Sequence, residues 1–231
     1  MFDRIRKVLG KPAAPGRAAT EAPSRFADAP VSEWAATQGL VFSADQTGSL
    51  VLKGQIQDRP WRLERGRPTR DYIVGDELRA RAQLGLADEI AAMVMNRALS
   101  ERLEQAAYER STDHLRTAID DNLPQEVRWL ALFEEQVWED LPIEFWSRYS
   151  VYSDRPAMAK GWIDPRLADL MLQWPAPGPS DQVPFMLLLM NGKAYLRMEY
   201  RPADLPTLQH AALIFTSACE AALGSAVDLA L

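Results

Sequence analysis

The chain has 231 residues, of which 47% are hydrophobic and seven are tryptophan, so its composition is that of a globular protein and excludes a wholly disordered chain. Its net charge of −6 disfavours a general polyanion binder, because such binding depends mainly on neutralisation of phosphates by basic side chains. The single cysteine, Cys219, permits no intrachain disulfide, and no apolar run approaches the ~20 residues that span a bilayer, which together predict a soluble, cytoplasmic protein.

Residues 1–30 are predicted to form a flexible basic arm that continues into a linker rich in proline and alanine. In "MFDRIRKVLG", apolar side chains recur at spacings of three and four, which predicts a short amphipathic helix. The apolar positions are Phe2, Ile5 and Leu9, and the basic positions are Arg4, Arg6, Lys7 and Lys11. This helix could dock on an anionic membrane surface or on a protein partner; the alternative is a frayed terminus.

The next part of the chain is predicted to alternate helices with short strands. A helix over 31–42 should end at Gly39, which suits the left-handed conformation of a helix C-terminus. Gly54 interrupts the apolar alternation of the first strand and indicates a bulge. Period-two alternation predicts strands over 49–57, 61–65 and 77–86, and Asp88 is predicted to cap a long helix over 89–111.

The last part of the chain carries clearer signals. Asp164 and Pro165 are predicted to open a helix, and so are Asp204 and Pro206. Asn191-Gly192 between two strand-like runs predicts a type I′ hairpin, because that turn needs positive φ twice. The run 126–138 fits a helix or a buried strand, whereas the aromatic-rich run 145–153 indicates a strand, and we interpret the two as strands linked through "EDLP".

These elements predict an α+β fold in which antiparallel hairpins pack against helices in one globular domain, residues 31–231. The stretch "RLERGRP" at 62–68 resembles "RMEYRP" at 197–202, and the order helix, hairpin, helix occurs twice. This pattern predicts two similar lobes, 31–118 and 119–231, that share a sheet or pack face to face. The alternative is a chance likeness, since strands with alternating arginine and glutamate are common.

Arginine is concentrated in "RPWRLERGRPTR", residues 59–70, and in the strand that follows. Alternation places Trp61 and Leu63 on a buried face and Arg62 and Glu64 on an exposed one. The candidate residues for binding an anionic ligand or an acidic partner are Arg62, Arg65, Arg67, Arg70, Arg79 and Arg81. The main alternative is solvation or pairing with the nine acids of residues 113–144, and nucleic acid is the least favoured partner.

No motif for phosphate binding, zinc binding or a serine nucleophile occurs, so the sequence predicts no cofactor, no metal and no catalytic residue. Cys219 and His210 would lie half a turn apart on one helix, which makes Cys219 a core residue rather than a nucleophile. Asp113-His114 is interpreted as a helix end at the surface. Glu64 and Glu199 are expected to point away from the core, whereas the tryptophans should fill it or line a pocket.

Together these observations favour a non-enzymatic interaction or adaptor protein in the cytoplasm. Residues 1–11 would dock it to a protein complex or to the inner face of a membrane. The alternative is a binding protein for a small anionic molecule, or an enzyme, with a pocket between two lobes. The sequence predicts no particular oligomeric state.

Overall fold

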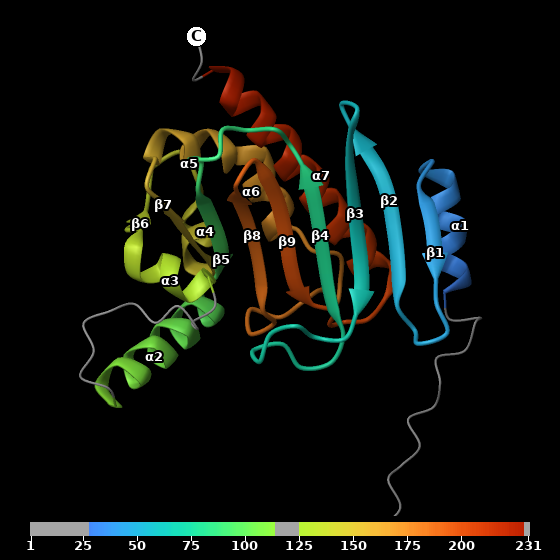
Figure 1. Ribbon diagram of the computed structural model, residues 1–231, viewed down its shortest axis with the longest axis horizontal. Coiled ribbons are helices and arrows are strands. Elements are labelled where there is room, and N and C mark those ends of the chain that lie inside the picture. The colour runs from blue at the N-terminus through green and yellow to red at the C-terminus, as the bar shows by residue number, and fades with distance from the viewer. Residues whose placement is uncertain (1–27, 114–124, 229–231) are drawn as a thin grey trace, which may run out of the picture.

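The computed structural model describes residues 28–113 and 125–228, and within them nine strands form a single antiparallel sheet flanked by seven helices (Figure 1). This confirms the predicted mixture of helices and antiparallel strands. The order across the sheet is β1-β2-β3-β4-β9-β8-β5-β7-β6. The strands are β1 Val41–Ala44, β2 Leu50–Ile56, β3 Arg59–Gly66, β4 Glu77–Gln83, β5 Ala92–Asn96, β6 Glu135–Gln136, β7 Tyr149–Ser153, β8 Phe185–Met190 and β9 Lys193–Glu199.

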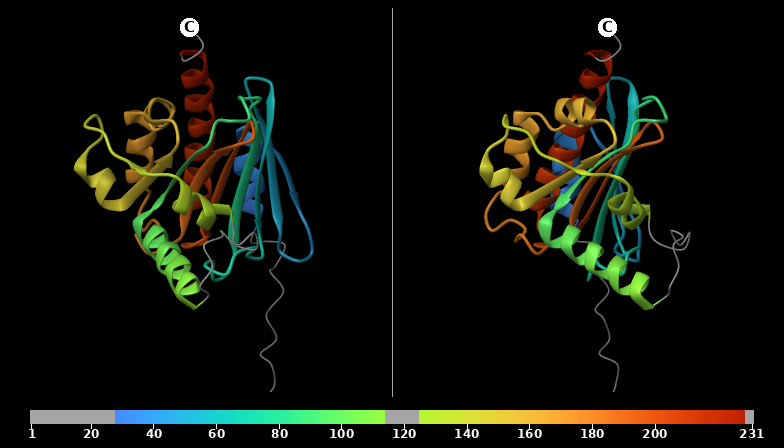
Figure 2. Two further views of the ribbon diagram at one scale, coloured as in Figure 1. Left: turned by 60° about the vertical axis from the view of Figure 1, so that its left-hand side comes forward. Right: turned by 90° about the vertical axis from the view of Figure 1, so that its left-hand side faces the viewer.

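Five helices cover one face of the sheet, which we call the back face (Figure 2). They are α1 Ala29–Thr37, α4 Ile143–Arg148, α5 Pro156–Trp162, α6 Pro165–Leu172 and α7 Leu205–Asp228. Helix α7 packs on β2, β4 and β9 and buries an apolar stripe that includes Phe215 and Cys219. Asp164 caps α6 as predicted, because its carboxylate accepts a hydrogen bond from Leu167 N at 2.7 Å.

Two helices, α2 Arg97–Asp113 and α3 Gln125–Leu132, lie on the opposite, front face. They cover the part of the sheet around β5, β7 and β8 and enclose a second apolar cluster with Met93, Met95 and Trp129. Among the described residues, no helix packs on the front face of β2, β3, β4 and β9 (Figure 1). The polar sides of these four strands are therefore open to solvent or to a partner, except at Glu77 of β4 and Glu199 of β9, which the loop of residues 67–76 covers.

The structure corrects two sequence predictions. Residues 92–96 form a strand, β5, rather than the start of a long helix. Both faces of the sheet are covered at this strand, so all five of its side chains are buried. A segment enclosed on both sides loses the alternation that marks a strand. Residues 125–132 and 143–148 are helices rather than strands, and only 135–136 and 149–153 join the sheet. Short apolar runs fit either structure, and here tertiary packing decides.

The predicted hairpin at Asn191-Gly192 is confirmed, with φ of 49° and 70° at the two turn residues. This hairpin, β8 and β9, lies between β4 and β5, so both proposed lobes contribute strands to one sheet. The repeat of helix, hairpin and helix is not confirmed by this arrangement, and the division into two lobes stays a prediction. Within the described ranges, no helix is long and apolar enough to cross a membrane.

Gly54 marks a close approach rather than the predicted bulge. The register of β2 and β3 runs without interruption, and Gly54 lies directly opposite Trp61. A Cβ atom at Gly54 would come within 2.8 Å of the Trp61 indole nitrogen. The indole of Trp61 in turn packs against Phe215 of α7, with ring centroids 6.1 Å apart. The glycine thus makes room for the tryptophan that anchors this end of the sheet to the back-face helix.

Candidate ligand-binding site

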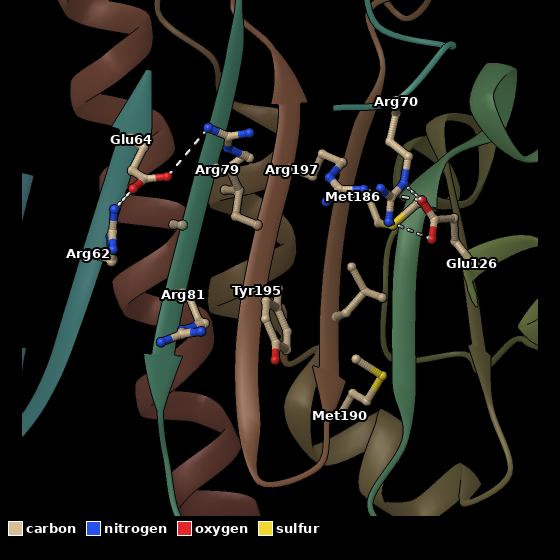
Figure 3. Close-up of a pocket in the computed structure, with 13 residues that line it drawn as sticks. Arg62, Glu64, Arg70, Arg79, Arg81, Glu126, Met186, Met190, Tyr195 and Arg197 are labelled. Atoms are coloured by element: carbon tan, nitrogen blue, oxygen red, sulfur yellow. Dashed lines mark hydrogen bonds and ion pairs between the residues drawn. The ribbon is translucent and has the colours of Figure 1, made fainter. Parts of the chain in front are cut away.

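An open hollow of about 340 Å³ lies on the front face where helix α3 meets the uncovered strands (Figure 3). Arginines reach it from several elements, and one wall is apolar, made by Met186, Leu188 and Met190 of β8. The arginines are Arg62 of β3, Arg79 and Arg81 of β4, Arg197 of β9, and Arg70 of the loop before β4. The volume falls in the range of roughly 300–1,000 Å³ that is typical of ligand sites.

The strand register places like charges opposite each other in this hollow. Arg62 lies opposite Arg81, and Arg79 lies opposite Arg197. Such pairs are destabilising unless anions separate them. Glu64 forms ion pairs with both Arg62 and Arg79.

Arg81 differs from Arg62 and Arg79, because its guanidinium makes no hydrogen bond or ion pair within the described ranges. It therefore remains an uncompensated cation, and the residue opposite it on β3 is a second arginine, Arg62.

Glu126 of α3 fixes the arginines at the edge of the hollow. This buried carboxylate accepts hydrogen bonds from Arg70, from the Tyr72 hydroxyl at 3.0 Å and from Arg197 Nη1 at 3.2 Å. Burial alone would raise the pKa of Glu126, but the hydrogen bonds and charge of Arg70, with help from Arg197, lower it below its ordinary value. Glu126 therefore stays ionised and holds two guanidinium groups in place.

Two further glutamates anchor the loop of residues 67–76, which connects β3 to β4. Glu77 is fully buried and accepts hydrogen bonds from Thr69 N at 2.6 Å and from the Thr69 hydroxyl, and it pairs with Arg197 Nε at 2.8 Å. Glu199, also buried, accepts a hydrogen bond from Val74 N at 2.9 Å. Glu199 lies on the polar side of β9, away from the back-face core as expected, but it is buried because this loop covers that side of the strand.

The structure brings four of the six predicted arginines together: Arg62, Arg70, Arg79 and Arg81. Arg65 lies elsewhere, where it donates a hydrogen bond to Asp28 at 3.0 Å and two to the Gly48 carbonyl. Arg67 is exposed in the loop and lines neither this hollow nor a neighbouring one at β2 and β3. A role for Arg65 and Arg67 in binding a partner elsewhere on the surface stays a prediction.

Sequence reasoning missed Glu77, Glu126 and Arg197 as parts of this site. Alternation with Leu78 and Met198 places Glu77 and Arg197 on the polar side of their strands, so their direction was readable from the sequence. The loop that buries Glu77 could not be foreseen, because loop paths leave no periodic pattern. Glu126 lies in a segment that we interpreted as a strand, which removed it from consideration.

The other candidates for chemistry are structural. Cys219 is buried in the back-face core, and burial raises the pKa of its thiol well above the ordinary range. The His210 ring contacts the Leu170 carbonyl through Nε2 at 2.7 Å and packs against Trp174. Every tryptophan packs against one of the two apolar clusters, as expected of core residues. His114 and residues 1–11 lie outside the described residues.

Residues 28–113 and 125–228 contain no group of three or more histidine, cysteine or acidic side chains placed to hold a metal ion. Comparison with known proteins finds no matching family model, no matching curated protein and no matching solved structure. The arginine-lined hollow is thus the feature from which a function can be argued.

Proposed function

We propose that this chain is a non-enzymatic binding protein whose site is the arginine-lined hollow and whose ligand is anionic. The observation that carries the proposal is the incompletely compensated pair of Arg62 and Arg81. Arg62 shares Glu64 with Arg79, and Arg81 has no partner among the described residues, so the pair carries excess positive charge. A carboxylate or phosphate between the two guanidinium groups would remove the repulsion and form charge-assisted hydrogen bonds.

The surroundings of the pair support a binding site. Arg70 and Arg197 are held by the buried Glu126, so their orientation is fixed before a ligand arrives. Preorganised donors reduce the entropy that binding costs. The net charge of −6 repels general polyanions from the remainder of the surface, so anions are attracted to the cationic hollow alone. The apolar wall of the hollow then favours anions that also carry an apolar group.

The proposal is tested by titrating the ¹⁵N-labelled protein with glutarate, and in a parallel experiment with inorganic phosphate. We expect the amide resonances of Arg62, Arg81 and Tyr195 to shift in a saturable manner. The Arg81→Gln variant should lose these shifts, whereas Arg67→Gln, which removes an exposed arginine outside the hollow, should keep them. If neither anion shifts these resonances at millimolar concentration, the hollow is not an anion site and the proposal falls.

We further infer that residues 1–11 recruit the protein to a membrane or a complex in the cytoplasm, as an adaptor would be recruited. The support is the basic amphipathic pattern of Phe2, Ile5 and Leu9 against Arg4, Arg6 and Lys7. Deletion of residues 1–11 should abolish co-sedimentation with vesicles that contain phosphatidylserine, or remove a co-purifying protein. If the shortened chain behaves like the intact chain in both assays, the arm has no docking role.

A further inference from the structure

A second hollow of about 720 Å³ lies beside the first on the same side of the sheet. Residues 38–41, parts of β2 and β3, and the end of β4 line it, with Lys53 and Gln55 among its polar side chains. The two hollows share Arg62 and Arg81. The two hollows therefore adjoin at these two arginines, and we refer to them together as the trough, which extends across the strands from β8 to β2.

One row of side chains runs along the trough. The register pairs Lys53 with Arg62, Arg62 with Arg81, Arg81 with Tyr195, and Tyr195 with Leu188. The row thus begins with three adjacent cations and ends with an aromatic and an aliphatic side chain. Neighbouring strands are about 4.8 Å apart, so the row spans about 19 Å. Like Arg81, Lys53 makes no hydrogen bond or ion pair within the described part of the chain.

We propose that the occupant of this trough is an extended acidic segment of another protein, laid across the strands. The proposal deepens the proposed function and rests on it. In an extended chain, side chains two residues apart point the same way and are about 6.7 Å apart. Two acidic side chains with this spacing match the three cations, which extend over about 10 Å. An apolar side chain about four residues further along reaches Tyr195, Leu188 and Met190.

The shape and charge of the trough favour a polypeptide over other anions. A small dicarboxylate or a phosphate would contact the arginines but leave the apolar wall of β8 exposed. Single-stranded nucleic acid on a sheet surface relies on several exposed aromatic rings for base stacking. Of the aromatic residues that line the trough, Tyr195 is accessible, whereas Trp61 is buried in the core. An acidic peptide with one apolar anchor uses the full length of the row.

The test measures binding of a fluorescein-labelled peptide ETETTTL, whose two glutamates and leucine share one side when the chain is extended, by fluorescence anisotropy to the full-length protein. Its reversed sequence, LTTTETE, is measured as well, because either chain direction fits the row, and the tighter of the two is used. The matched peptides replace glutamate by glutamine or leucine by glycine, and the protein variants are Arg81→Gln and Arg67→Gln. Glutarate, inorganic phosphate and oligo(dT) serve as competitors.

We expect the peptide to bind at least tenfold more tightly than glutarate, because it adds the burial of a leucine side chain to the ionic contacts. The change of leucine to glycine, the change of glutamate to glutamine, and Arg81→Gln should each weaken binding about tenfold. Arg67→Gln should have no effect.

The remaining outcomes separate this inference from the proposed function. If glutarate binds with the same dependence on Arg81 and the peptide binds no more tightly, the anion site stands and the peptide proposal is overturned. If oligo(dT) binds more tightly than the peptide and its binding also depends on Arg81, nucleic acid is the ligand class, and the peptide proposal is again overturned. If no anion binds, both proposals fail.

Discussion

Glu77 of β4 and Glu199 of β9 lie directly opposite each other in the sheet, and both are almost completely buried. Two carboxylates in this position are tolerated because each has its own donors: Thr69 and Arg197 for Glu77, and Val74 N and Arg201 for Glu199. The pair therefore fastens the loop of residues 67–76 at two points and fixes Arg197 at the candidate site.

Replacement of Glu77 by glutamine should lower the free energy of unfolding by about 2–3 kcal/mol, because it removes one of the two buried carboxylates that pair with the Arg197 guanidinium. Glu64→Gln is the matched control, since Glu64 pairs with arginines at the surface and its loss should cost about 1 kcal/mol or less. Urea denaturation at pH 7 measures both values. Equal losses in the two variants would mean that burial of Glu77 contributes nothing.

Acidification below about pH 4.5 should destabilise the protein through Glu126. The pKa of Glu126 is lowered in the folded protein, so the unfolded chain binds the proton first. The stabilisation is complete above the ordinary pKa of the carboxyl group and is lost as the pH falls through the folded-state pKa. The slope of unfolding free energy against pH between 4.5 and 3 should become shallower in Glu126→Gln. A slope unchanged from that of the wild type would contradict this role.

His210 should produce a separate loss of stability at higher pH. Burial lowers the pKa of its imidazole, an effect that the hydrogen bond to the Leu170 carbonyl only partly offsets. The unfolded chain therefore takes up a proton at a pH where the folded chain does not, and stability falls as the pH drops below about 6.5. Denaturation midpoints measured from pH 8 to pH 5 should decrease in the wild type and stay nearly constant in His210→Gln.

Substitution of Gly54 by alanine should lower the free energy of unfolding by about 1–3 kcal/mol, because the new methyl group would overlap the Leu40 side chain and the Trp61 indole. Gly66→Ala is the control: it lies in the neighbouring strand, and its nearest contact is the flexible end of Arg79 at 3.4 Å. Thermal denaturation followed by tryptophan fluorescence measures the effect. If both variants have the same midpoint, the close approach of Gly54 and Trp61 is not a constraint.

The sequence predicted those elements whose pattern is local. Period-two alternation identified β3 and β4 and the side of the sheet on which Arg62 and Arg81 lie, and Asn191-Gly192 located the β8–β9 hairpin. These signals depend on the backbone and on near neighbours along the chain, so they are visible without tertiary contacts.

Features that depend on distant contacts were not predicted. Strand β5 is enclosed on both faces and shows no alternation, and helix α3 has too short an apolar pattern to be distinguished from a strand. The site itself joins Arg70, Glu126 and Arg197, which come from widely separated parts of the chain. Their meeting follows from the order of strands in the sheet, which no local pattern encodes.

The insertion of β8 and β9 between β4 and β5 has a consequence for how the protein is made. Strands β4 and β5 follow one another in the sequence, but they pair with β9 and β8 rather than with each other. Until residues 185–199 have left the ribosome, β4 and β5 therefore each have an unpaired edge. Closing the sheet requires β4 to pair with β9, which lies far from it along the chain, and such distant contacts favour slow folding after synthesis is complete. Release of a nascent chain before residue 185 would therefore leave two exposed strand edges that can aggregate.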